Sequence, residues 1–89
     1  MEEIFNIQEK IKKFIIETSY ISEDQISNET LIFTEGIMDS IGFISIISFL
    51  EETFQVVTFD YELVDSNFES VDSIAKFVIK KLNQCKTVG

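Results

Sequence analysis

The sequence contains no histidine, tryptophan or proline, and its single cysteine, Cys85, stands near the C-terminus. A disulfide within the chain is therefore impossible, and a zinc site built from Cys and His nearly so. Without histidine no Ser–His or Cys–His pair can form, and the lysines cluster near the two ends of the chain. We therefore expect no metal site, and we expect any covalent chemistry to use a reactive group brought from elsewhere. Cys85 is interpreted as a residue of the C-terminal tail rather than as a site.

Basic residues are also scarce, because seven Lys and Arg stand against 16 Asp and Glu and give a formal net charge of −9. Such a charge repels a phosphate backbone, so we expect no nucleic-acid partner. No segment approaches the roughly 20 apolar residues of a membrane span, and the start "MEEIFNIQEK" lacks the features of a secretory signal. The sequence predicts a cytoplasmic protein that does not insert into membranes.

Apolar residues at helical spacing are abundant, and 45% of the 89 residues are hydrophobic, which suffices for one small domain. We place this domain at 1–89, with a core of about 3–83 and a flexible tail at 84–89. A first helix is predicted over residues 3–18 from the apolar positions Ile4, Ile7, Ile11, Phe14 and Ile15. A last helix, capped by Ser70, is predicted from Val71, Ile74, Phe77, Val78 and Leu82, with Lys80 and Lys81 near its negative end.

The segment from residue 20 to 38 has no single period, but it is too apolar for a free linker, so we expect a long loop that packs. Ser22 and Gln25 have the spacing of a capping box and predict one short helical turn inside this loop. Gly36 provides a position that tolerates positive φ before the next helix. After residue 54 we expect irregular chain rather than a β-bridge, with Asp60 capping a short turn.

The central stretch "GIMDSIGFISIISFLEETF" predicts a helix with apolar residues on more than one face. A single stripe suffices to bury it, and this stripe consists of Phe43, Ile46, Ile47, Leu50 and Phe54. Ile41 and Ile44 lie on the opposite side with Ser45 and Ser48, so we expect these two isoleucines to be exposed. Three substantial helices and a short turn before the last one predict a small all-α bundle.

Ser40 lies at the N-terminus of this predicted helix, and its presence there has two interpretations. Asp39 and Ser40 can simply cap the helix, which is the ordinary reason for such residues at this place. A helix N-terminus also tolerates a phosphate ester, because its free N–H groups and partial positive charge favour an anion. Ordinary phosphorylation of Ser40 would also fit, but the apolar strip of Ile41 and Ile44 beside the serine favours a partner or cargo that is more apolar than a phosphate.

The same stretch resembles the signature of acyl and peptidyl carrier proteins, which is Gly, an apolar residue, Asp-Ser-apolar and a helix that ends in Leu-Glu-Glu-x-Phe. "NETLIF" is similar to the acidic-Thr-Leu segment of the family's first loop. "FDYELVDSNFESVDSIAKFV" is similar to the turn, the short third helix and the fourth helix of free-standing carriers. The resemblance covers the chain from Phe5 to Leu82.

This resemblance implies a four-helix carrier bundle with three main helices, one short third helix and a long first loop. It implies that Ser40 carries 4′-phosphopantetheine donated by coenzyme A, whose thiol holds acyl or aminoacyl groups as thioesters. The protein itself is then not an enzyme. Asp39 matches the aspartate that the phosphopantetheinyl transferase recognises, and Ile41 matches the apolar residue that docks on partner enzymes, with Ile44 beside it.

The implied partners are the transferase, the enzymes that load acyl or aminoacyl groups, and downstream synthases, and we expect the carrier to be a monomer. Fatty-acid carriers hold several acidic residues on the exposed face of this helix. In this chain we expect Gly42, Ser45 and Ser48 on that face, and the first acidic residues, Glu51 and Glu52, come only after them. This difference favours a specialised polyketide, nonribosomal peptide or related pathway.

Two other functions are alternatives to this one. A fatty-acid carrier is the alternative within the family, and a helical adaptor without a covalent group is the alternative outside it. A calcium-binding EF-hand is disfavoured, because residues 19–38 lack the acidic spacing and the central glycine of its loop.

Overall fold

The computed structural model describes the backbone of residues 4–87 and the side chains of residues 4–83. This part of the chain contains the helices α1 (Ile4–Ser19), α2 (Ser40–Phe54), α3 (Asp65–Phe68) and α4 (Val71–Thr87), the 3-10 turns η1 (Glu23–Gln25) and η2 (Asp60–Glu62), and no strand. The predicted all-α class, with three main helices, a short third helix and a long first loop, is confirmed. None of the described helices is long and apolar enough to cross a membrane.

Some predictions fall at the ends of the chain. Residue 3, where the first helix was expected to begin, lies outside the described residues, and so do the side chain of Cys85 and residues 88–89 of the expected tail. The backbone of α4 continues as a helix to Thr87, beyond the boundary expected near residue 83.

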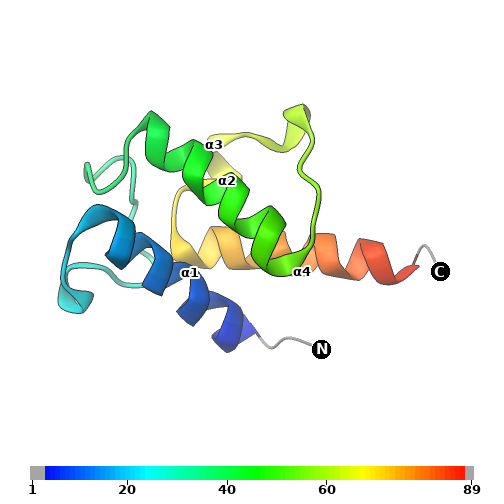
Figure 1. Ribbon diagram of the computed structural model, residues 1–89, viewed down its shortest axis with the longest axis horizontal. Helices are drawn as coiled ribbons and strands as arrows, with labels where there is room; N and C mark the ends of the chain where they lie inside the picture. Colours follow the sequence, from blue (N-terminus) through cyan, green and yellow to red (C-terminus); the bar gives the residue numbers. More distant parts are fainter. Residues whose placement is uncertain (1–3, 88–89) are drawn as a thin grey trace.

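The helices pack around α4, which contacts each of the other three. α1 and α4 share the most extensive interface, and α3 leads directly into α4. Figure 1 shows the long loop of residues 20–39, in cyan to green, at the end of the bundle where α1 stops and α2 begins. This arrangement places Ser40, the first residue of α2, beside the long loop.

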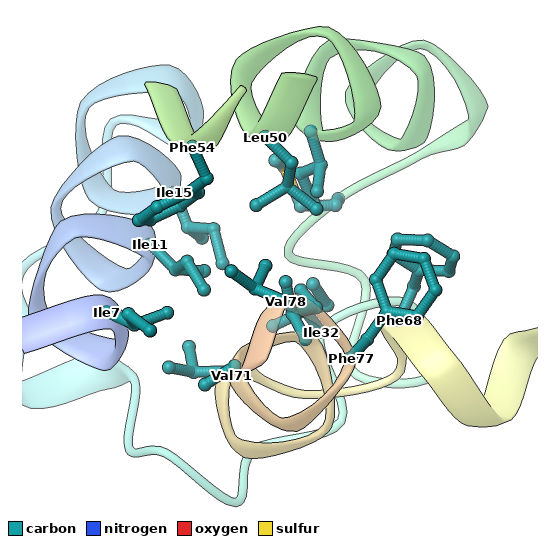
Figure 2. Close-up of a cluster of buried hydrophobic side chains, with 14 of the residues drawn as sticks. Ile7, Ile11, Ile15, Ile32, Leu50, Phe54, Phe68, Val71, Phe77 and Val78 are labelled. Atoms are coloured by element: carbon teal, nitrogen blue, oxygen red, sulfur yellow. The ribbon is translucent and has the colours of Figure 1, made fainter. Parts of the chain in front are cut away.

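The core is formed by one face of each main helix, as the periodicity predicts. α1 contributes Ile7, Ile11 and Ile15, α2 contributes Ile46, Leu50 and Phe54, and α4 contributes Val71, Ile74, Ala75, Phe77 and Val78. In Figure 2 the isoleucines of α1 point toward Leu50 and Phe54 on one side and toward Val71 and Val78 on the other. Ile4 was expected in this stripe, but it is partly exposed because it lies at the end of α1.

The long loop packs on the core, as expected. Ile26 and Ile32 are buried, and the N–H of Ile32 donates a 2.9 Å hydrogen bond to the carbonyl of Glu69, just before α4. Gly36 has a φ of +77°, which confirms that this position requires a left-handed conformation. The loop is thereby held against the junction of α3 and α4.

The predicted caps around the loops have different outcomes. The capping box of Ser22 and Gln25 is present at η1, where the N–H of Ser22 donates to the side chain of Gln25 at 2.7 Å. The N–H of Ser73 donates to the hydroxyl of Ser70 at 3.2 Å, which confirms Ser70 as the cap of α4. Asp60 does not cap the turn before α3, because it is itself the first residue of η2. That turn is closed instead by the N–H of Phe59, which donates to the carboxylate of Glu62 at 2.9 Å.

Candidate functional site

The N-terminus of α2 is capped by Asp39, whose backbone is extended. One carboxylate oxygen of Asp39 accepts a 2.9 Å hydrogen bond from the N–H of Gly42, and its carbonyl accepts one from Phe43 at 2.9 Å. The capping interpretation of Asp39 is therefore confirmed. Asp39 is nevertheless exposed, so its negative charge faces solvent directly before Ser40.

Ser40 is the first residue of α2 and is exposed. Within the described residues, no partner hydrogen-bonds its hydroxyl, so the oxygen is accessible to a reagent. The N–H groups of Ser40 and Ile41 point out of the first turn, where an α-helix provides them no internal acceptor. These donors, with the partial positive charge of the helix terminus, suit a phosphodiester at the Ser40 oxygen.

An open pocket of about 460 Å³ lies directly beside Ser40, with Asp39 and Asp65 also on its lining. The rest of the lining is apolar and is formed by Phe33, Met38, Phe43, Leu63 and Phe68. We name this cavity the apolar pocket. Its walls come from the long loop, α2, α3 and the segment after η2, which explains why the helical periodicity did not predict it.

Three aromatic rings in the wall of the apolar pocket pack edge to face. The ring centroid of Phe43 lies 5.7 Å from that of Phe33 and 5.3 Å from that of Phe68. Such T-shaped pairs are a favourable geometry for aromatic rings. The pocket therefore has an ordered, apolar wall within reach of a group attached at Ser40.

The outer face of α2 carries the two isoleucines at the predicted positions. Ile41 and Ile44 are 74% and 64% exposed and, three residues apart on one helix, lie next to each other on its surface. Gly42, however, was wrongly expected on this face. It is buried, and a Cβ atom there would lie 2.8 Å from the sulfur of Met38.

Carboxylates on α2 are confined to its last turn and a half. Glu51 accepts hydrogen bonds from the hydroxyl of Thr58 at 2.7 Å and from the N–H of Thr58 at 3.1 Å. These two bonds lower the pKa of the Glu51 carboxyl from its usual range. Among the described residues there is no group of three or more Cys, Asp and Glu side chains that could hold a metal ion.

A buried ion pair that the sequence did not reveal supports the segment after α2. Lys81 lies in the middle of α4 and not at its negative end as expected, and its ammonium is 2.9 Å from the carboxylate of Glu62. Both side chains are at least nine-tenths buried, and the ammonium also lies 4.6 Å from the ring centroid of Phe59. Burial raises the pKa of Glu62, but the hydrogen bonds from Lys81 and Phe59 and the charges of Lys81 and Lys80 lower it further, so its pKa is below the usual value.

Comparison with known proteins agrees with this geometry. No protein-family model matches the chain. The chain is 37% identical over 76 residues to the acyl carrier protein of Buchnera aphidicola subsp. Baizongia pistaciae (strain Bp), which covers 85% of this chain and 94% of that protein. It is 35% identical over 79 residues to the acyl carrier protein of Buchnera aphidicola subsp. Acyrthosiphon pisum (strain Tuc7), which covers 85% and 92% of the two chains.

The chain therefore belongs to the acyl carrier protein family. Acyl carrier proteins are carriers that generally hold a phosphopantetheine arm, and they are not catalysts. Family membership thus supports a carrier role for this chain, with partner enzymes for loading and synthesis.

Proposed function

We propose that this protein is a carrier whose Ser40 is esterified with 4′-phosphopantetheine from coenzyme A. The observation that carries the proposal is the exposed Ser40 hydroxyl, which lies at the N-terminus of α2 and on the rim of the apolar pocket. When bound, the arm supplies a thiol that holds acyl or aminoacyl groups as thioesters. The chain, which lacks histidine, provides the attachment point and the surroundings.

In this proposal the residues around Ser40 have separate roles. Asp39 caps α2 with one oxygen, so the carboxylate is held in place while its charge is presented to the phosphopantetheinyl transferase. Ile41 and Ile44 form an exposed apolar strip that docks on the transferase and on the loading and synthase enzymes. The apolar pocket shelters the apolar part of the cargo from water.

We further propose that the carrier serves a specialised polyketide, nonribosomal peptide or related pathway. The surface of α2 next to Ser40 is apolar, and the first carboxylates of this helix are Glu51 and Glu52, near its other end. Partners that read this surface would use apolar contacts rather than a row of basic residues. A carrier of fatty-acid synthesis is the second candidate, and it fits the names of the relatives equally well.

Intact-mass measurement tests the attachment. After incubation with coenzyme A and a broad-specificity phosphopantetheinyl transferase, the wild-type chain gains one phosphopantetheine, and Ser40→Ala gains none. Ser48→Ala is the matched control, because Ser48 is an exposed serine on the same helix and its replacement leaves the gain intact. No gain by the wild-type chain would favour the adaptor alternative, and a gain by Ser40→Ala would place the arm elsewhere.

The pathway is tested with the arm-bearing protein. Purified loading enzymes of fatty-acid synthesis and adenylating enzymes for amino acids are each offered the same carrier, and the thioester formed is identified by mass. Slow loading by the fatty-acid enzymes supports the specialised pathway. Rapid loading by them would establish the second candidate.

A further inference from the structure

A second, smaller pocket lies near the other side of the α2 N-terminus. It has a volume of about 300 Å³ and is lined by Thr18 and Ser19 at the end of α1, by Gly36 and Ile37 of the loop, and by Ile41 and Ser45 of α2. We name it the rear pocket. Met38 and Asp39 line both this pocket and the apolar pocket, so these two residues lie where the cavities approach each other.

The side chain of Met38 is fixed in this position from two sides. The hydroxyl of Ser19 donates a 3.1 Å hydrogen bond to its sulfur, and the absence of a side chain at Gly42 leaves the room that the sulfur occupies. Met38 is 6% exposed although it borders two open cavities. It therefore fills the space between the first turn of α2 and the end of α1.

We propose that Met38 is the wall between the two pockets and sets the length of the acyl chain that the apolar pocket accepts. This inference rests on the proposed function, since the chain is cargo attached through Ser40. A cargo that enters beside Ser40 meets the Met38 side chain before it can reach the rear pocket. Shortening this side chain joins the cavities, and the longer space then accepts a longer cargo.

Methionine suits a boundary of this kind because its side chain is unbranched and fills irregular space. The rear pocket beyond it carries the hydroxyls of Thr18, Ser19 and Ser45, but Ile37 and Ile41 provide apolar walls. The residue that limits the cargo is therefore a buried loop residue two positions before Ser40 and not a residue of one of the helices.

The test uses the arm-bearing protein loaded with straight-chain acyl groups of increasing length, from acetyl to palmitoyl. The melting temperature Tm of the wild-type protein is expected to rise with acyl length and then stop rising, because further carbons stay in water. In Met38→Ala the Tm continues to rise for acyl chains longer than the wild-type limit. The longest chains are expected to raise the Tm of this variant by about 4 °C or more above its value at that limit. Met38→Leu keeps nearly the same volume and retains the wild-type limit.

Met38→Val removes fewer atoms and serves where Met38→Ala does not fold, and it is expected to shift the limit in the same direction by a smaller amount. An unchanged acyl length limit in a folded Met38→Ala or Met38→Val protein overturns the assignment of Met38, while the proposed function stands. Failure of the wild-type chain to accept the arm overturns the proposed function, and the assignment of Met38 with it. The intact mass recorded before loading separates these two failures.

Discussion

Asp39 combines a structural contact and a surface charge in one side chain. The capping bond to Gly42 uses one carboxylate oxygen, and the residue remains exposed, so a partner can still read the charge. These two properties can be separated by chemistry, because an asparagine also accepts a hydrogen bond at an N-cap but carries no charge. The comparison of Asn with Ala at this position therefore distinguishes stability from recognition.

Asp39→Asn is expected to keep the stability of the wild-type protein and to slow the transfer of phosphopantetheine to Ser40. Asp39→Ala is expected to slow the transfer as well and to cost about 1 kcal/mol of unfolding free energy, because the cap is lost. Denaturant unfolding and the rate of mass gain check the two effects. If Asp39→Asn accepted the arm at the wild-type rate, Asp39 would be a helix cap without a part in recognition.

Ile41→Ser and Ile44→Ser should separate docking from folding. Both side chains are mostly exposed, so their replacement should change stability by no more than about 0.5 kcal/mol. Loss of an anchor at the centre of a small interface costs about 2 kcal/mol of binding, or roughly thirtyfold in affinity. The measurements are thermal unfolding and the rates of arm transfer and cargo loading.

Val57→Ser is the matched control for these two variants, because Val57 is 62% exposed on the loop after α2. It should leave both stability and rates unchanged. Equal slowing by all three variants would mean that exposed apolar area in general, and not the strip beside Ser40, controls docking.

At the scale of the elements, the three main helices and the packing of the long loop follow from the sequence, whereas the particular contacts between distant segments do not. The i, i+3 and i+4 spacing of apolar residues predicts α1, α2 and α4, since each needs one apolar stripe for burial. No such period connects Glu62 with Lys81, which are 19 positions apart and meet only in space. The apolar pocket could not be predicted for the same reason. The sequence shows Phe33 and Leu63 only as apolar residues of two loops, and the fold is needed to show that they line one cavity.

The exposed and buried faces of α2 were predicted well, with one informative exception. Gly42 was placed outside because glycine has no hydrophobic signal of its own. Its burial nevertheless follows from local spacing, because Gly42 lies four residues before Ile46 on the buried face of α2 and four residues after Met38, whose sulfur packs beside it. The candidate residues Asp39, Ser40, Ile41 and Ile44 lie where the local helix periodicity puts them, and their functions stay predictions.

η2 is joined to α4 by the pair of Glu62 and Lys81, and this pair is expected to hold the whole segment between α2 and α3. Lys81→Ala leaves the Glu62 carboxylate buried without its cation, which costs about 3 to 5 kcal/mol. The double variant Glu62→Gln with Lys81→Met removes both charges and is expected to be more stable than Lys81→Ala. Chemical denaturation of the three proteins checks this order, and equal stability of Lys81→Ala and the wild-type protein would show that water replaces the cation.

The whole molecule is acidic, and its stability should decrease in acid for a specific reason. The pKa values of Glu51 and Glu62 are lowered by hydrogen bonds in the folded state, so the unfolded chain binds protons more readily. Their contribution is present above the usual Glu pKa of about 4.3 and is lost as the pH falls through the lower folded values. Urea unfolding at a series of pH values should show this loss.

Thr58→Val provides the control for the acid prediction, because it removes the hydroxyl that donates to Glu51. The variant should lose less stability on acidification than the wild-type protein. An equal or steeper loss would mean that the hydrogen bond from the Thr58 hydroxyl does not set the pKa of Glu51.

The two tyrosines lie outside the core, and this position makes them local optical probes. Tyr20 is 93% exposed after α1, and Tyr61 is 77% exposed and stacks on Phe59, with ring centroids 5.8 Å apart. Because the chain has no tryptophan, Tyr20→Phe leaves Tyr61 as its single strongly emitting side chain. The fluorescence of this variant follows the segment over the Glu62–Lys81 pair, whereas far-ultraviolet circular dichroism follows the helices. A fluorescence transition that precedes the dichroism transition would reveal the segment opening while the bundle remains folded, and this motion would widen access to the apolar pocket, which Leu63 of the same segment lines.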